Sequence, residues 1–266
     1  MFAILAAATF VLGAIVGSFL NVVIHRYPLG ESIVWPGSRC GTCRAPIKPY
    51  DNVPIVSWLI LRGRCRACGA PFSSRYMLVE LANALFYLAI FIRTGPTIGF
   101  LPLAAVISMT ILLIYIDLDI QILPDVIDIP GIAIGLAVAA LGIGAVHSDL
   151  TLAPDLLGSA IGAATGAAII VGLNLAYRIA RGADGMGMGD AKMLAMIGAV
   201  SGWKAVIIVL FLASIVGAVI GVALAHQANE KLDVAMPFGV FLGLAFLAAL
   251  FFGSAMSGWY SAFLPA

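Results

Sequence analysis

The sequence predicts an all-α polytopic membrane protein with about eight transmembrane helices and a small cytosolic module that binds zinc through four cysteines. Of the 266 residues, 62% are hydrophobic and only 10% are charged, and the mean hydropathy is +1.11. Soluble domains are closer to half apolar and a quarter charged. The apolar residues form runs of about 20, the length that crosses a bilayer. The net charge of +1 gives no indication of nucleic-acid binding, and we expect none.

The first apolar run, residues 2–24, is long enough to span a membrane. It has no basic segment before it and no small-residue cleavage site after it, so we expect a retained helix and not a removed signal peptide. Asn21 lies near its end, where a hydrogen bond to another helix or a functional role is open to it. Residues 26–75 are dense in Arg, Pro, Gly and Cys and too polar to span. We therefore divide the chain into a first helix (1–25), a zinc-binding module (26–75) and a membrane-embedded domain (76–266).

Seven further apolar segments follow, and we find no internal repeat in the chain. They cover residues 76–94, 99–117, 127–146, 154–177, 190–201, 204–225 and 236–253. The segment 190–201 is short for a full crossing, so its boundaries are the least well defined.

The basic residues predict the orientation, because cytoplasmic loops carry an excess of Lys and Arg. With eight spans and the N-terminus outside, Arg93 and Lys204 lie on the outer side. The cytoplasmic side then carries Arg26, Arg39, Arg44, Lys48, Arg62, Arg64, Arg66, Arg75, Arg178, Arg181, Lys192 and Lys231. In the reverse topology almost all of these basic residues would lie on the outer side, against the rule.

All four cysteines fall in two Cys-x-x-Cys pairs, Cys40/Cys43 and Cys65/Cys68. Such spacing lets two thiolates reach one ion from a tight turn, and two turns complete a tetrahedral site. The competing readings are disulfides, a redox pair or iron. Structural disulfides are rare in the reducing cytosol, and a polar segment of this size has little core of its own, so we predict structural zinc.

Two aspartates lie at helix boundaries beside apolar runs. Asp117 ends the run 111–116, and Asp190 follows the glycine-rich stretch 185–189. In the predicted topology both lie at the cytoplasmic ends of their helices. Two such carboxylates at equal depth can share a proton and activate water for attack on a peptide carbonyl, one as base and one as acid. Asp128, by contrast, is expected to cap the fourth span.

Other functions remain open on the residues alone. The three histidines are scattered, so no Ser/His/Asp or Cys/His set fits, and the glycine stretch lacks the Gly-Lys-Ser/Thr of a phosphate loop. A proton- or cation-coupled transporter that uses the same two aspartates is the alternative to a protease. A scaffold protein whose aspartates only cap helices is a third reading.

The ordered motifs resemble the type IV prepilin peptidases, membrane aspartyl proteases of the Gly-x-Gly-Asp kind, over nearly the whole chain. They comprise residues 17–24, the two cysteine pairs, 52–59, 62–65, Arg75-Tyr76 with Glu80, Ile116-Asp117, 123–125, 187–192 and 237–239. Each motif is weak by itself, but the ordered set is specific.

The resemblance implies that Asp117 and Asp190 are the catalytic pair. Asp117, and not Asp119, stands seven residues before Pro124, as the family pattern requires. The implied substrates are prepilins or pseudopilins with a short basic leader, cut after a glycine on the cytoplasmic side of the bacterial inner membrane. Gly187 and Gly189 would let an extended substrate strand approach. Lys192 either stabilises the ionised form of Asp190 or extends to the membrane interface.

Members with the cysteine module usually also methylate the new N-terminal amine with S-adenosylmethionine. The resemblance therefore implies a second activity for this chain, with Gly63 and Arg64 in the matching tract. The sequence contains no nucleotide-binding fingerprint that would locate the methyl donor, and it gives no oligomeric state.

Overall fold

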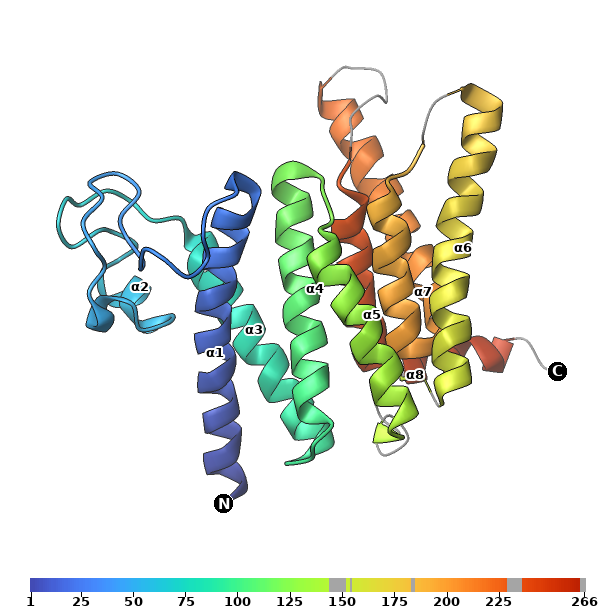
Figure 1. Ribbon diagram of the computed structural model, residues 1–266, viewed down its shortest axis with the longest axis horizontal. Helices are drawn as coiled ribbons and strands as arrows, with labels where there is room; N and C mark the ends of the chain where they lie inside the picture. Colours follow the sequence, from blue (N-terminus) through green and yellow to red (C-terminus); the bar gives the residue numbers. More distant parts are fainter. Residues whose placement is uncertain (144–151, 154, 183–184, 229–235, 264–266) are drawn as a thin grey trace. The chain divides into compact units, whose positions relative to one another are not determined.

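The computed structural model describes the chain except for residues 144–151, 154, 183–184, 229–235 and 264–266 (Figure 1). The described residues form helices and connecting loops, with two isolated β-bridges and no strand. The helices are α1 (Phe2–Arg26), η1 (Tyr27–Leu29), η2 (Pro49–Asp51), α2 (Val56–Ile60), α3 (Ser74–Thr94), α4 (Phe100–Ile120), α5 (Asp125–Ala140), α6 (Leu156–Arg181), α7 (Met188–Ala228) and α8 (Phe238–Phe263). The predicted all-α fold class is confirmed.

Five helical segments among the described residues are long and apolar enough to cross a membrane, which makes the chain a multi-pass membrane protein. They are Phe2–Leu29, Ser74–Thr94, Phe100–Ile120, Leu156–Arg181 and Met188–Leu224, with a shorter apolar segment at Phe238–Gly253. Of the span expected at 127–146, the structure describes a helix to Ala140, and residues 144–146 lie outside the described ranges. The number of eight spans stays a prediction.

The chain forms two compact units, Met1–Leu112 and Leu113–Ala266, whose boundary falls within α4. In the first unit α1 packs closely along α3. A Cβ added at Gly13 would lie 2.7 Å from the Cα of Ala84, and one at Gly17 would lie 2.7 Å from the Cα of Glu80. Small residues at this four-residue spacing let membrane helices approach until their backbones touch.

Buried hydrogen bonds fix the register of α1, α3 and the first half of α4. The fully buried Asn83 donates to the carbonyl of Gly13 at 2.7 Å and accepts from Ser108 at 2.9 Å. Asn21 donates to the carbonyl of Tyr76 at 2.9 Å, which is the interhelix hydrogen bond that its position suggested. Polar side chains in an apolar surrounding are retained when such partners satisfy them.

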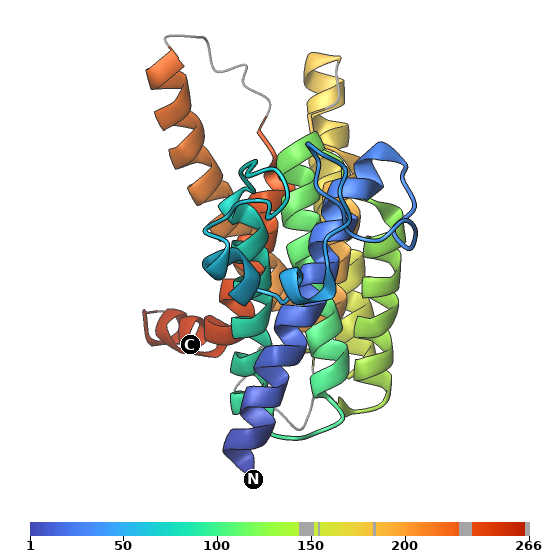
Figure 2. The same cartoon turned by 90° about the vertical axis from the view of Figure 1, so that its left-hand side faces the viewer.

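In the second unit α7 packs against α5, α6 and α8 (Figure 1). The α6–α7 contact again depends on glycine: a Cβ at Gly166 or at Gly162 would collide with the backbone of Leu194 or Gly198. Beyond this contact the later turns of α7 diverge from α6 (Figure 2), and Val219 and Val222 are exposed there.

The helix α7 is interrupted at Gly202, where φ is 77° and ψ is 173°. The two segments expected at 190–201 and 204–225 are therefore the two halves of α7. The break leaves carbonyls without helical partners, and neighbouring groups supply donors. The N–H of Ala153 donates to Val200 at 2.9 Å, and the Ser159 hydroxyl donates to Ala199 at 2.5 Å.

Candidate active site and metal centre

The four cysteines lie together in the first unit. All four Sγ atoms are within 4.8 Å of one another, and those of Cys40 and Cys68 are 3.9 Å apart. A tetrahedral zinc with bonds of about 2.3 Å places its sulfur ligands roughly 3.8 Å apart, whereas a disulfide needs about 2.05 Å. The thiols therefore fit a four-coordinate metal ion and not disulfide bonds.

Each cysteine pair sits on the same kind of turn. The N–H of Cys40 donates to Ala45 at 2.9 Å, and the N–H of Cys65 donates to Ala70 at 2.8 Å. Each turn continues through a left-handed residue, Arg44 with φ 60° and Gly69 with φ 72°. A bridge closes each turn, between residues 39 and 46 and between residues 64 and 71. The two turns have equivalent backbone hydrogen bonds, and together they bring the four thiols into one cluster.

These turns correct our statement that the chain contains no internal repeat. Residues 39–46 and 64–71 share the pattern Arg-Cys-x-x-Cys-x-Ala-Pro and the same hydrogen bonds. The repeat escaped detection because it is only eight residues long. In addition, the two copies differ at the left-handed position. The first copy has Arg44 there, whereas the second has Gly69, the residue type that this conformation favours.

The turns prepare the thiols unequally for a metal. The backbone N–H groups of Cys43 and Thr42 point at the sulfur of Cys40 and lower its pKa to about 6. The N–H of Ala70 acts likewise on Cys68, but hydrogen bonds of its thiol to the neighbouring sulfurs, together with burial, raise that pKa to about 11. A thiolate is the form that binds a metal, and the N–H groups around Cys40 favour its thiolate.

In the second unit, the carboxylate of Asp117 lies near the C-terminal end of α4 and is only 4% exposed. Its Oδ2 accepts a hydrogen bond of 3.0 Å from the N–H of Val240, in the first turn of α8. A Cβ at Gly239 would come within 2.9 Å of the same oxygen. The first turn of α8 can therefore lie this close to the Asp117 carboxylate only because residue 239 has no side chain.

Asp190 lies in the first turn of α7 and is half-buried. Its N–H donates to the carbonyl of Gly187 at 3.2 Å, and a Cβ at Gly187 would lie 3.4 Å from its Oδ2. The carboxylates of Asp190 and Asp117 are close enough to interact electrostatically. Two aspartates from separate helices therefore lie in the same part of the unit.

Leu123 connects the two halves of this site. A Cβ at Gly189, next to Asp190, would lie 2.8 Å from the Cβ of Leu123, and one at Gly239 would lie 3.0 Å from its Cδ atoms. The loop after α4 thus packs between the starts of α7 and α8. The sequence identified Gly189 as room for substrate, and the structure shows that Leu123 contacts it, while Gly187 is exposed.

Lys192 has an ionic partner that the sequence did not suggest. Its Nζ forms an ion pair of 2.5 Å with Asp125 at the start of α5. Both side chains are partly exposed, so the pair adds little stability, but it joins the first turns of α5 and α7. Asp119 is exposed in the last turn of α4.

Asp128 is the residue whose environment sequence reasoning missed. It was expected to cap a helix, but the N-cap of α5 is Pro124. Asp128 is fully buried, and neither of its carboxylate oxygens has a hydrogen-bond partner among the described residues. It interacts electrostatically with Asp125, Lys192 and Asp190. A third carboxylate therefore lies beside the proposed pair.

Gly63 and Arg64, the tract implied for methylation, lie in the first unit at the wall of a cavity of about 820 Å³. Gly63 has φ 63° and is covered by the indole of Trp58, whose Cε2 and Cζ2 would lie 2.9 Å from an added Cβ. Only glycine can adopt this positive φ without strain and also leave room for the indole. The side chain of Arg64 is exposed beside it.

The fold and the two centres define a multi-pass membrane protein with clustered aspartates in one unit and a four-cysteine metal centre in the other. A family model described as the bacterial peptidase A24 N-terminal domain matches residues 11–94, and one described as the type IV leader peptidase family matches residues 104–222. The chain belongs to the type IV leader peptidase family.

Relatives called prepilin leader peptidase/N-methyltransferase match over most of their length. The Aeromonas hydrophila protein is 38% identical over 94% of this chain and 92% of its own length. The Pseudomonas putida protein is 35% identical over 91% of this chain and 89% of its own length. The Pseudomonas aeruginosa protein is 34% identical over 96% of this chain and 93% of its own length. No solved structure matches the chain. These comparisons favour the peptidase over the transporter and the scaffold.

Proposed function

We propose that this chain is an aspartyl endopeptidase that removes the leader of type IV prepilins or pseudopilins and then methylates the new N-terminal amine. The observation that carries the proposal is that Asp117, near the end of α4, and Asp190, at the start of α7, interact electrostatically, and that Gly189 and Gly239 beside them both contact Leu123. Membership of the leader peptidase family and the names of the relatives supply the substrate class and the second activity.

In the proposed mechanism one aspartate is ionised and the other is protonated, and the pair titrates as a unit. The ionised carboxylate takes a proton from a water molecule, whose oxygen attacks the carbonyl carbon of the scissile peptide bond. The protonated carboxyl donates to the carbonyl oxygen and, as the C–N bond breaks, a proton passes to the leaving amine. The N–H of Val240 keeps the Asp117 carboxylate oriented throughout.

Cleavage is proposed to follow a glycine, on the cytoplasmic side of the bacterial inner membrane, with the N-terminus of the enzyme outside. Support comes from the basic residues of the 26–75 segment and the loop after α6, which the positive-inside rule assigns to the cytoplasm. Both aspartates stand at helix ends on that side. The apolar stem of the substrate can thus stay in lipid while an extended leader lies along the exposed Gly187. Gly189, which packs on Leu123, and Lys192 flank that position.

We assign structural zinc to Cys40, Cys43, Cys65 and Cys68. Bound zinc supplies a four-coordinate cross-link between the two turns. The chain contributes the N–H groups that stabilise the thiolate of Cys40, and the left-handed residues that fold each turn back. The segment contains only short helices, so the metal supplies stability that a core would otherwise provide.

Co-expression with a prepilin that carries a short basic leader tests the proposal. We expect the pilin to lose the mass of its leader, with the new N-terminus directly after glycine, and to gain one methyl group. An intact prepilin in the presence of folded enzyme would refute the peptidase. A cleaved but unmethylated pilin would refute only the second activity.

A further inference from the structure

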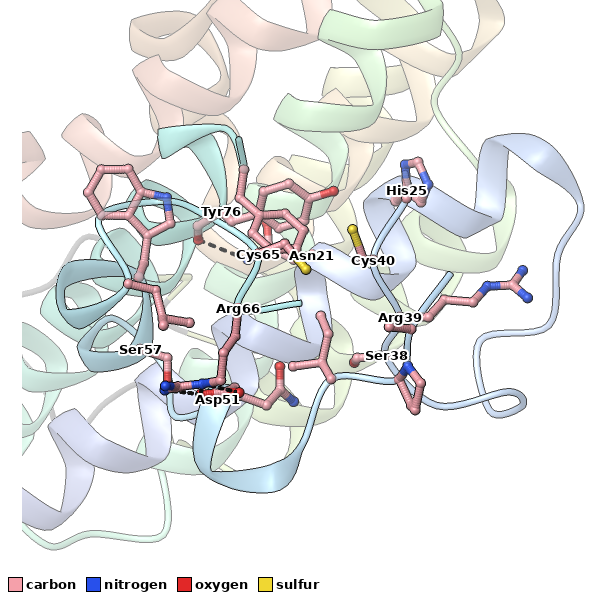
Figure 3. Close-up of a pocket in the computed structure, with 18 of the residues that line it drawn as sticks. Asn21, His25, Ser38, Arg39, Cys40, Asp51, Ser57, Cys65, Arg66 and Tyr76 are labelled. Carbon is pink, nitrogen blue, oxygen red and sulfur yellow. Dashed lines mark hydrogen bonds and ion pairs between the residues drawn. The ribbon is translucent and has the colours of Figure 1, made fainter. Parts of the chain in front are cut away.

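The short helix α2 of the cysteine module presents an apolar face that the described part of its unit leaves exposed. Val56, Leu59 and Ile60 lie three and four residues apart, on one side of the helix, and are 49%, 57% and 70% exposed. The other side is fixed to the module, where the buried Ser57 hydroxyl donates to the carbonyl of Tyr50 at 3.2 Å (Figure 3). Contiguous exposed apolar side chains mark a surface that contacts a protein or a membrane.

The helices α1 and α3 of the same unit provide a scale of depth in the membrane. Both are long and apolar enough to span it. Their contacts follow one another turn by turn, since Gly17 packs on Glu80 and, one turn further along α1, Asn21 donates to the carbonyl of Tyr76 (Figure 3). Each level of α1 is thus matched to a level of α3.

The lengths of the two helices place the hydrocarbon boundary at the hydrogen bond between Asn21 and Tyr76. About 20 residues cross a hydrocarbon core of roughly 30 Å. Counted from Phe2, the first residue of α1, they end at Asn21, and counted back from the last residue of α3 they end next to Tyr76. The contact of Gly17 with Glu80 is one turn further in, about 6 Å inside this boundary.

The helix α2 is attached to α3 at this inner level. The N–H of Ile55, the N-cap residue of α2, donates to the Oε2 of Glu80 at 2.7 Å, and Glu80 is buried against α1. In Figure 1 and Figure 2, α2 accordingly lies beside α1 and well before the C-terminal end of that helix. Amphipathic segments of the membrane interface lie about 5–10 Å inside the boundary. The depth of α2 therefore matches theirs.

Positively charged side chains follow the apolar face directly. Arg62 and Arg64 come after α2 in the sequence, and both are exposed. Apolar side chains next to Lys or Arg are typical of segments that lie in the membrane interface, because acyl chains cover the former and anionic headgroups attract the latter. A protein partner would have to displace lipid from this depth. Depth and charge together favour lipid as the partner of α2.

We propose that α2 inserts the side chains of Val56, Leu59 and Ile60 into the lipid leaflet on its own side of the membrane, with Arg62 and Arg64 at the headgroups. The cysteine module is then seated in the membrane surface and not surrounded by water. This lipid contact does not depend on the proposed function, but it bears on it. Cleavage leaves the new N-terminal amine of the pilin at the membrane surface, because the stem that follows stays in lipid, and the module is held at that same surface.

Photolabelling of the wild-type full chain in lipid nanodiscs tests the insertion. The probe is an uncharged aryl diazirine that dissolves in the bilayer core, and peptide mass spectrometry locates its adducts. Leu59 and Ile60 should be labelled about fivefold or more above Leu29. Leu29 is the matched position, because its side chain is 62% exposed but it follows the end of α1. Labelling of Leu59 and Ile60 no stronger than that of Leu29, as expected in water or beneath a protein partner, overturns the proposal.

Ile60→Asp tests the same contact from the side of the protein. A carboxylate is costly in lipid, so α2 should leave the leaflet and the labelling of Leu59 should fall several-fold. Leu29→Asp is the matched control and should leave the labelling of Leu59 unchanged. Zinc content shows whether each variant is folded, and if Ile60→Asp does not fold, the labelling of the wild type decides. Undiminished labelling of Leu59 in folded Ile60→Asp overturns the proposal, whereas the proposed peptidase stands or falls by prepilin cleavage alone.

Discussion

The Oδ2 of Asp117 accepts a 3.0 Å hydrogen bond from the N–H of Val240, across a separation of 123 residues. The contact joins the end of α4 to the first turn of α8, so the carboxylate is held by backbone and not by a mobile side chain. A catalytic group needs this kind of restraint, because small displacements from the reacting geometry cost large factors in rate.

Asp117→Asn and Asp190→Asn should each abolish leader cleavage, with at least a hundredfold loss, because an amide can neither take up nor donate the proton in transfer. Both variants should insert and melt like the wild type. Asp119→Asn, at the exposed aspartate two residues from Asp117, is the matched control and should cut normally. Cleavage is read from the shift of co-expressed prepilin on a gel. Normal processing by either of the first two variants would show that the pair is wrongly assigned.

Gly239→Ala should slow cleavage by about ten- to a hundredfold without unfolding the protein. The new methyl group would lie 2.9 Å from the Oδ2 of Asp117 and 3.0 Å from the Cδ atoms of Leu123, so α8 or the carboxylate must shift. Gly172→Ala provides the control, since an added Cβ there meets no atom within 4 Å. Initial rates on a purified prepilin compare the two. An equal rate in both variants would mean that the contact of α8 with Asp117 does not position it.

The sequence predicts the helices of this protein well, but it does not predict the environment of Asp128. Apolar runs gave the helices, because length and hydropathy are local properties of the chain. The break at Gly202 fell between two expected segments for the same reason. The burial of Asp128 depends on which helices surround α5, and no local pattern encodes that. A carboxylate in the first turn of a helix therefore suggested a cap, although Pro124 occupies the cap position.

The same limit applies to the glycines of the site. The sequence indicated that residues 187 and 189 need small side chains, but it could not say what approaches them. In the structure Leu123 packs on Gly189, a contact between residues far apart in the chain, whereas Gly187 faces its own neighbour Asp190. The cysteine spacing was more informative, because each turn is built within eight residues and only the meeting of the two turns is tertiary.

Asp128→Asn should keep cleavage within about threefold of wild type and should melt at the same or a higher temperature. A fully buried carboxylate with no hydrogen-bond partner among the described residues costs stability in its charged form, and the amide has the same shape without the charge. Melting and cleavage are measured on the same detergent-solubilised sample. Loss of cleavage in a folded Asp128→Asn would instead make the site one of three carboxylates.

Cys43→Ser should reduce bound zinc from about one equivalent to a small fraction, because a four-thiolate site loses a ligand. Elemental analysis of purified protein gives the content. Thr42→Ser, in the same turn but outside the ligand set, should keep its zinc. We expect Cys43→Ser to lose methylation before cleavage, since the aspartates belong to the other unit. Loss of cleavage first would count against this division of the two activities.

Gly63→Ala should impair methylation while leader cleavage continues at a rate close to that of the wild type. At φ 63° a side chain is strained, and the added Cβ would lie 2.9 Å from the indole of Trp58, so that ring must move out of the cavity wall. Gly41→Ala, in the first cysteine turn, is the control because nothing lies within 4 Å of its added Cβ. Mass spectrometry of the mature pilin separates the two activities, as a lost leader and a gained methyl group are independent mass changes. Full methylation by Gly63→Ala would mean that the position of Trp58 is irrelevant to the methyl donor.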